Sequence, residues 1–496
     1  MVKPTFEGFK ELTEQGDLIP VFKEIMADLD TPVSAYTKLA EGSTHAFLLE
    51  SVQGGEKWGR YSLLGVDPNK LFEARGNQVK IHDLKNGEVE QFAHTNPANA
   101  LRDLMQSYRS VPTDELPCFG GAVGYLGYDT VRYYEEIPDE NPDILNTPDS
   151  LFMLTDQVVV FDNLKNTIKV VVNVHVQEEG DLQAQYEGAV ARIQAIIAKL
   201  RRPQPQLPDT QTSKPLTEAD FTSEMTQAAF EEAVLKGKEY INAGDIMQVV
   251  LSQRLSIPFE QDPTQLYRVL RMTNPSPYLF LLRMGDFSLV GSSPEILVRQ
   301  ENGIATVRPI AGTRPRGRDE VHDLALEEEL LADPKERAEH IMLVDLGRND
   351  IGRIAEIGSV EVTEQFVIER YSHVMHIVSN VEGKLKPDLD AYDVVAATFP
   401  AGTLSGAPKI RAMEIIDELE VSRRGPYGGA VGYFGYSGYM DLAIAIRTAV
   451  IKNGRLYIQA GAGVVADSDP TKEYEETMNK ARAIFRAVEK MQQGLE

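Results

Sequence analysis

The sequence is short of several features, and each shortage excludes a class of protein. Its single cysteine, Cys118, rules out an intramolecular disulfide and gives no sign of an oxidising compartment. No apolar run approaches the roughly 20 residues that a membrane-spanning helix needs. Residues 1–30 lack a basic segment followed by an apolar one, so no secretory signal is expected. A cytoplasmic protein without a membrane contact is the simplest interpretation.

Positive charge is also scarce, because 50 Lys and Arg stand against 75 Asp and Glu, a formal net charge of -25. Nucleic-acid phosphates are bound by clustered Lys and Arg, so no nucleic-acid partner is expected. The chain repels anions at long range, although salt screens that field beyond about 8 Å at physiological ionic strength. An enzyme of this composition that acts on an anion therefore needs positive charge within its site.

The chain divides at a segment of unusual composition. Residues 201–215, RRPQPQLPDTQTSKP, are rich in Pro, Gln and Thr and lack apolar periodicity, which is typical of a linker. At roughly 100–200 residues per domain, 496 residues allow two or more domains. We therefore predict an N-terminal region over 1–205, a linker over 206–221 and a second region over 222–496.

Helices and strands are expected on both sides of this linker. Residues 168–176, IKVVVNVHV, predict a strand, and 189–200 predict a helix before the linker. After the linker, residues 230–241 place apolar side chains on one helical face, and 247–255 predict a strand.

One sequence occurs twice. Residues 120–128 read GGAVGYLGY and residues 428–436 read GGAVGYFGY, so eight of nine positions match. Paired glycines let two backbones pass closely or take positive φ. This favours a structural role, as strand or corner elements, over a shared ligand role, and it leaves an old duplication open.

Two Asp-Pro pairs, at 333–334 and 469–470, predict helix starts, with Asp as the cap and Pro in the first turn. The two helices carry acidic residues and a lysine: Glu339 on the first, and Glu473, Glu476 and Lys480 on one face of the second. Two carboxylates with waters and a substrate oxygen suit Mg²⁺. On sequence pattern alone, a solvated helix face is the commoner reason for such residues.

Other motifs are weaker when each is taken by itself. The glycine-rich residues 401–409 and 459–465 could offer backbone N–H groups to a carboxylate, although turns are the default interpretation. Neither segment is a P-loop or a dinucleotide loop. His376 stands among apolar residues, as structural histidines do, and no HExxH or Cys–His cluster supports zinc. The neighbours of Cys118 do not form a nucleophile elbow, so no glutaminase site is expected.

The order of the segments is more specific than any one of them. From about residue 222 to 488 the chain resembles the chorismate-utilising enzyme family, through PSPYLFLLR, GSSPEILVR, PIAGTRPRG, AEHIMLVDLGRNDIGR, YSHVMH, AGTLSGAPKIRAMEII, AIAIRTAV, QAGAGVVADSDP and EYEETMNKARA. The N-terminal part resembles that of anthranilate synthase large subunits, through LLESV at 48–52 and GGAVGYLGY. The resemblance implies an α+β fold of two large, mostly antiparallel β-sheets that pack together and are flanked by helices.

The resemblance also implies a magnesium site and two carboxylate grips. Glu339 and Glu476, with Glu473 close by, match the Mg²⁺ ligands, and the metal would hold the ring carboxylate of chorismate. The residues that match the substrate grips are Thr403, Lys480, Gly461, Gly463 and Gly312, together with Tyr427 and Arg447 at the enolpyruvyl carboxylate. An Arg fork suits a planar carboxylate, so Arg447, Lys480 and Mg²⁺ would supply the positive charge that a -25 chain needs locally.

Four positions bear on which reaction is carried out. Gln248 stands where water-adding members carry a basic Lys, which favours ammonia as the nucleophile. Ala311 stands where enzymes that make the para-amino isomer usually carry a nucleophilic Lys, which favours amination at C2. Glu295 matches the acid that protonates the departing C4 hydroxyl, and His376 matches the histidine of the later elimination.

The implied reaction is amination of chorismate at C2, then loss of pyruvate to give anthranilate, the first committed step of tryptophan biosynthesis. An aminodeoxychorismate synthase component is the alternative. A non-catalytic subunit would be expected to lack Glu295, His376 or a metal ligand, and all are present.

The resemblance implies one protein partner and one inhibitor. With no glutaminase site, glutamine-dependent activity would need a separate glutamine amidotransferase subunit, and so a hetero-oligomer. Feedback inhibition by tryptophan is expected from two segments. The matching residues are Glu50 and Ser51 on one wall of the pocket, Pro277, Tyr278 and Leu279 on the other, and either Lys57 or Arg60 as a basic residue.

Overall fold

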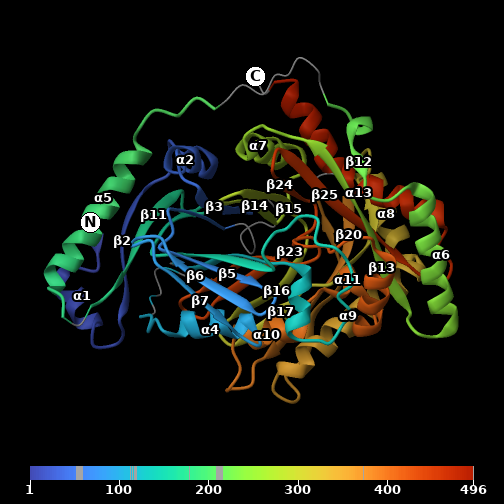
Figure 1. Ribbon diagram of the computed structural model, residues 1–496, viewed down its shortest axis with the longest axis horizontal. Helices are drawn as coiled ribbons and strands as arrows, with labels where there is room; N and C mark the ends of the chain where they lie inside the picture. Colours follow the sequence, from blue (N-terminus) through green and yellow to red (C-terminus); the bar gives the residue numbers. More distant parts are fainter. Residues whose placement is uncertain are drawn as a thin grey trace.

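The computed structural model describes residues 1–51, 60–111, 113, 116, 120–177, 179–207, 216–371 and 374–494. In this part of the chain two antiparallel sheets pack face to face, and helices cover their outer sides (Figure 1). The expected α+β architecture is therefore confirmed. Among the described helices, none is long and apolar enough to span a membrane. Cys118 and Lys57 lie outside the described residues.

The first sheet has the order β1-β2-β11-β10-β4-β3-β14-β15-β24-β25-β13-β12, with β21 paired to β13. Its strands are β1 (Val2–Lys3), β2 (Leu18–Met26), β3 (His45–Glu50), β4 (Tyr61–Val66), β10 (Gln157–Asp162), β11 (Thr167–His175), β12 (Thr222–Ser223), β13 (Gln248–Pro258), β14 (Tyr278–Met284), β15 (Phe287–Ser293), β21 (Gly406–Ala407), β24 (Thr448–Lys452) and β25 (Arg455–Val464). Strands β11 and β13 confirm the two strand predictions.

The second sheet has the order β18-β20-β17-β16-β23-β22-β8-β9-β5-β6-β7, with β19 paired to β20. Its strands are β5 (Lys70–Arg75), β6 (Gln78–Asp83), β7 (Val89–Ala93), β8 (Gly121–Leu126), β9 (Ser150–Thr155), β16 (Ile296–Glu301), β17 (Ile304–Val307), β18 (Ile310–Pro315), β19 (Glu361–Arg370), β20 (Val374–Lys384), β22 (Ala430–Gly435) and β23 (Met440–Ile444). Both sheets contain strands from before and after residues 206–221, so the two sequence regions share them. The boundary itself stays a prediction.

The described helices begin where local sequence signals place them. They are α1 (Phe6–Leu12), α2 (Pro32–Leu39), α4 (Pro97–Gln106), α5 (Leu182–Leu200), α6 (Gln227–Ala243), α7 (Pro263–Thr273), α8 (Glu320–Ala332), α9 (Pro334–Ile354), α10 (Ala391–Thr398), α11 (Gly402–Ser405), α12 (Lys409–Leu419) and α13 (Pro470–Gln492), with 3-10 turns η1 (Tyr128–Tyr133) and η2 (Glu218–Asp220). Asp333 caps α9 by accepting from the Glu336 amide, and Asp469 caps α13 by accepting from the Lys472 amide. Both predicted helix starts are confirmed.

The repeated sequence forms the centre of the second sheet. Strand β8 from the first copy pairs antiparallel with β22 from the second, and Gly124 lies opposite its counterpart Gly432. A Cβ at Gly124 would stand 2.0 Å from the Leu151 carbonyl oxygen, and one at Gly432 2.0 Å from that of Asp441. The glycines therefore allow close strand approach, which confirms the structural interpretation of the repeat.

The pairing of the two copies belongs to an approximate two-fold arrangement of most strands in the two sheets. Outward from β8 the order is β9-β5-β6-β7, and outward from β22 it is β23-β16-β17-β20. In the first sheet, β3-β4-β10-β11-β2 mirrors β14-β15-β24-β25-β13 in chain order. Residues 47–49 and 280–282 both read FLL, and Leu48 pairs with Leu281. These correspondences favour an internal duplication.

Candidate active site

The residues matched to the family site gather in the second half of the fold. Glu295 follows β15, Thr403 lies on α11 and Lys480 on α13, while His376 lies on β20 and Arg447 joins β23 to β24. The glycines at 461 and 463 lie on β25. Hydrogen bonds and charge interactions connect these elements, which are far apart in the sequence.

Glu295 is held in a state suited to donating a proton. The Thr403 hydroxyl donates to Glu295 Oε1 at 2.9 Å. Burial raises the pKa of Glu295 to about 7, against the opposing effects of the Thr403 hydrogen bond and the charges of Lys480 and Arg447. A carboxyl group with this pKa is largely protonated just below neutral pH and can act as a general acid.

Arg447 offers a guanidinium group to the site. Its backbone has φ of +50°, the left-handed region that costs a side-chain-bearing residue on the order of 1–2 kcal/mol. Burial lowers the pKa of Arg447, and the nearby Glu295 and Tyr371 oppose that shift. Within the described ranges no side chain forms a hydrogen bond or ion pair with this guanidinium. A half-buried cation with free donors is suited to binding an anion.

His376 is oriented by a bulge in its neighbouring strand. The pairing of β18 with β20 shifts register between Ala311 and Thr313, and the extra residue, Gly312, has φ of +69°. The Gly312 carbonyl accepts from His376 Nδ1 at 2.9 Å. His376 Nδ1 also lies 3.1 Å from the Thr313 hydroxyl, which can donate or accept. Because a carbonyl can only accept, the Gly312 contact assigns the proton to Nδ1 and leaves Nε2 as the nitrogen able to take a proton. Burial lowers the pKa of His376, which favours this neutral form.

Four carboxylates on two helices influence one another electrostatically. Burial raises the pKa of Glu339 on α9, and the charges of Glu336 and Glu476 raise it further. The pKa of Glu473 is raised by burial and by Glu476, while a hydrogen bond from Ser468 opposes the shift. Among the described residues no three His, Cys, Asp or Glu side chains are close enough to enclose a metal by themselves. Two repelling carboxylates do fit a cation that takes its other ligands from water and substrate.

Two glycines of β25, Gly461 and Gly463, form one wall of the site, and longer side chains pack directly against them. Lys480 Nζ donates to the Gly461 carbonyl at 2.9 Å and pairs with Glu476 Oε1 at 2.8 Å. A Cβ at Gly461 would lie 2.8 Å from the Tyr427 hydroxyl, and one at Gly463 would lie 2.6 Å from Gln248 Nε2. Larger residues at 461 and 463 would therefore displace two of the predicted site residues.

The structure adds one residue that sequence reasoning missed. The ring of Tyr371 packs edge-on against the His376 ring, with centroids 5.5 Å apart, and its hydroxyl donates to Glu369 at 2.8 Å. Burial raises the pKa of Tyr371. The signal in the sequence that could have identified Tyr371 was its position five residues before His376.

The two segments predicted to bind tryptophan are adjacent, but their side chains diverge. Glu50 on β3 lies opposite Leu279 on β14. The Glu50 carboxylate accepts from the Tyr267 hydroxyl at 2.5 Å and from Arg271 Nε at 3.1 Å, beneath helix α7. The Tyr278 hydroxyl instead donates to Asp441 of the second sheet at 3.0 Å. The Glu50 carboxylate and the Tyr278 ring therefore point to opposite faces of the first sheet.

Of the two basic residues predicted for this pocket, Arg60 is the one among the described residues, and it has an acidic partner. Arg60 Nη2 donates to Asp162 Oδ2 at 2.9 Å. Ser51 is the last described residue before the gap at 52–59, and Pro277 directly precedes β14.

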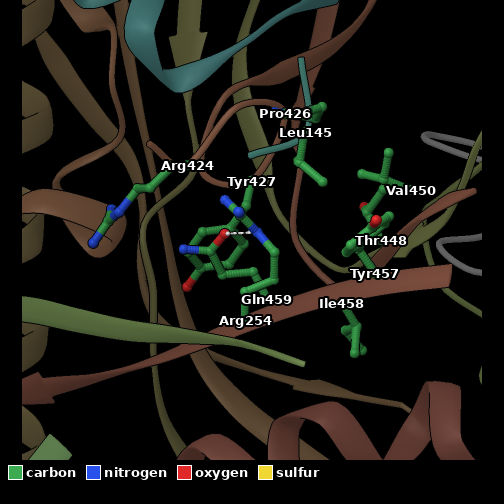
Figure 2. A pocket seen from close by; sticks show the side chains of 10 residues that line it. All are labelled: Leu145, Arg254, Arg424, Pro426, Tyr427, Thr448, Val450, Tyr457, Ile458 and Gln459. Carbon is green, nitrogen blue, oxygen red and sulfur yellow. Dashed lines mark hydrogen bonds between the residues drawn. The ribbon is translucent and has the colours of Figure 1, made fainter. Parts of the chain in front are cut away.

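A small cavity adjoins this half of the fold. Its volume is about 10 Å³, room for a single water molecule, and Figure 2 shows Tyr427, Arg424 and Gln459 among the side chains around it. It is too small for a ring substrate. The arrangement of Glu295, Arg447 and Lys480 is therefore the better candidate for the substrate site.

Comparison with known proteins gives a consistent result. The profile of a family described as chorismate binding enzyme matches residues 44–486. Anthranilate synthase component 1 of Pseudomonas aeruginosa is 53% identical over 499 residues, which covers 99% of each chain. The crystal structure of anthranilate synthase component I from Streptococcus pneumoniae has a TM-score of 0.77 and 40% identity, and covers 93% of this chain and 99% of its own. The menaquinone-specific isochorismate synthase of Escherichia coli shares the fold, with a TM-score of 0.70 and 18% identity. The match covers 97% of this chain and 98% of that one.

Proposed function

The chain belongs to the chorismate binding enzyme family, and we propose that it is the large, chorismate-converting subunit of an anthranilate synthase. The observation that carries this proposal is the meeting of a carboxyl group of pKa about 7 with two cationic side chains, of which the Arg447 guanidinium has no side-chain partner among the described residues. Glu295 lies within the electrostatic reach of both Arg447 and Lys480. Such a site can bind a dianion and give it a proton.

The proposed reaction assigns one task to each group. Arg447 and Tyr427 hold the enolpyruvyl carboxylate, while Lys480 and the β25 glycines hold the ring carboxylate. Ammonia forms a bond to C2, both ring double bonds shift by one position, and the C4–O bond breaks. Glu295 gives its proton to the departing hydroxyl, which leaves as water, and the new ammonium group at C2 loses one proton to become the amine. The product of this step is 2-amino-2-deoxyisochorismate.

The second step removes pyruvate. The C2 proton leaves to a base, the C3–O bond breaks, and the ring becomes aromatic anthranilate. We assign His376 to this elimination, because Nε2 is its proton-accepting nitrogen. Gln248 cannot deprotonate water, and Ala311 cannot form a covalent adduct, which supports ammonia as the direct nucleophile.

We propose Mg²⁺ as the cofactor, held by Glu339 and Glu476 with Glu473 beside them. When bound, the ion supplies positive charge that orients and polarises the ring carboxylate. The raised pKa of Glu339, caused by burial and by neighbouring carboxylates, supports a cation at this point.

The proposal is tested by incubating the purified chain with chorismate, an ammonium salt and Mg²⁺, and by following fluorescence and chromatography. Fluorescent anthranilate that disappears when EDTA is added is the expected result. An aminated product that keeps its enolpyruvyl group would indicate an aminodeoxychorismate synthase. Isochorismate would show that water competes at Gln248, and absence of any product would favour a non-catalytic subunit.

His376→Ala is expected to let the aminated intermediate accumulate, because amination does not use the imidazole whereas elimination does. Chromatography should show 2-amino-2-deoxyisochorismate in place of anthranilate. His82→Ala, on β6 of the first half, is the control and should give wild-type product. Anthranilate formation by His376→Ala at the wild-type rate would refute this role.

Glutamine-dependent activity is proposed to require a separate glutamine amidotransferase subunit that delivers ammonia, in a cytoplasmic hetero-oligomer. The component 1 names of the relatives support a second component.

Tryptophan is proposed as a feedback inhibitor that binds where β3 and β14 meet. Because the Glu50 carboxylate is held by Arg271, an ammonium group would have to displace that pair or use backbone oxygens instead. Saturating tryptophan is expected to suppress anthranilate formation in wild type and less so in Ser51→Phe. Equal activity with and without tryptophan would exclude inhibition.

A further inference from the structure

A buried ion pair lies beneath the site and has no part in the proposed reaction. Arg424 is 2% exposed and Glu420 is 7% exposed. Arg424 Nε donates to Glu420 Oε2 at 2.9 Å, and Nη2 donates to Oε1 at 2.6 Å, so the contact is a two-pronged fork. Well-packed apolar residues are often as stabilising as a buried ion pair, so stability alone does not account for this one.

The remaining donors of Arg424 connect two elements of the site. Nη1 donates to the Leu404 carbonyl at 2.6 Å, and Nη2 donates to the Val250 carbonyl at 2.8 Å. Leu404 directly follows Thr403 in α11, a helix of only four residues that cannot satisfy its own carbonyls. Arg424 therefore ties the segment that carries Thr403 to strand β13.

Glu420 extends the connection to the β25 wall of the site. Its Oε1 accepts from the Ser252 amide at 2.8 Å and from the Ser252 hydroxyl at 2.7 Å. Gln459 Nε2 donates to the same hydroxyl at 2.8 Å. Ser252 lies opposite Gly461 in the pairing of β13 with β25. The ion pair thus holds β13, and the strand paired with it, β25, carries Gly461, which Lys480 and Tyr427 contact.

The guanidinium group of Arg424 also supports two tyrosine rings. It lies 4.5 Å from the Tyr128 ring centroid and 5.5 Å from that of Tyr427. Figure 2 shows Arg424 and Tyr427 among the residues that line the small cavity, and both belong to the segment between α12 and β22. Movement of Arg424 would therefore release Tyr427 as well as α11.

We propose that the Arg424–Glu420 pair is a positioning device that sets Thr403 and Tyr427 relative to Glu295. Arg424 touches no reacting atom and acts through these neighbours. This inference rests on the proposed function of the site, and it adds a determinant of catalysis outside the substrate contacts.

The test compares Arg424→Met, Arg424→Lys and Glu420→Gln with wild type, using ammonia and chorismate. Misplacement of groups by about 1 Å can cost 10²-fold in rate, so kcat should fall about 10- to 100-fold in Arg424→Met and less in Arg424→Lys. The Thr403 hydrogen bond favours ionised Glu295, so its loss should move the descending limb of the pH profile of kcat/KM to higher pH. The control is Arg283→Met on β14, which breaks a pair with Asp262 at the N-cap of α7 and should leave both kcat and the descending limb unchanged.

A lowered Tm with wild-type kcat and an unmoved limb would overturn the inference, because it would show a purely structural pair. If Arg424→Met fails to fold, Glu420→Gln decides: a shifted limb supports positioning and an unmoved limb overturns it. The wild-type chain alone tests the proposed function, since each variant is compared with whichever product wild type makes. Failure of one proposal is therefore separate from failure of the other.

Discussion

Glu295→Gln is expected to lower kcat/KM for chorismate by about 10²- to 10⁴-fold, the usual contribution of a general acid. Glutamine keeps the shape and can still accept from Thr403, but it has no acidic proton for the C4 hydroxyl. Initial rates of anthranilate fluorescence measure the loss. Glu301→Gln, at the exposed end of β16, is the matched control and should behave as wild type.

The pH profile separates this role from a structural one. Because burial raises the pKa of Glu295 to about 7, the protonated form is lost as pH rises through that value. With rates expressed per mole of free ammonia, wild-type kcat/KM should be flat at low pH and fall above about pH 7. The residual activity of Glu295→Gln should lack this limb. A limb at the same pH in both proteins would assign it to another group.

Arg447→Met is expected to raise KM for chorismate roughly 100-fold. The reason is that a hydrogen bond to a charged group contributes up to about 3 kcal/mol of binding free energy, which the variant would lose. Arg447→Lys should recover part of this loss, since lysine keeps the charge but lacks the fork. Both variants keep a side chain at the left-handed backbone position, so the comparison isolates the guanidinium group. Substrate titration at fixed ammonia gives KM and kcat separately.

The control is Arg455→Met, at the start of β25, where Arg455 donates to Ser256 at 2.8 Å. It should leave KM at the wild-type value. An unchanged KM in Arg447→Met would place the carboxylate grip elsewhere.

Features set by neighbouring residues could be predicted from the sequence. The caps at Asp333 and Asp469 depend on hydrogen bonds within one helical turn, so an Asp-Pro pair was sufficient evidence. Strand β11 could be predicted because its alternate residues are apolar over a long run. The two-sheet architecture came from the family resemblance, since strand pairing joins residues that no local pattern connects.

The details that give the site its chemistry could not be predicted in the same way. The pKa of Glu295 depends on burial by elements far away in the chain, and the tautomer of His376 depends on a bulge at Gly312. The direction of Glu50 follows from strand register, which places its carboxylate beneath α7 rather than beside Tyr278. In each case the deciding contact is tertiary.

The two-fold arrangement of strands has a consequence for synthesis on the ribosome. Strand β8 pairs with β22, whose first residue, Ala430, follows Leu126 by about 300 residues. At a synthesis rate of about 5–20 residues per second, strand β8 of the first half is made roughly 15–60 s before its partner β22. During that time an apolar strand presents open backbone groups, which is the circumstance that promotes pairing with the wrong chain. A nascent polypeptide of this design therefore depends on protection of that edge until translation is nearly complete.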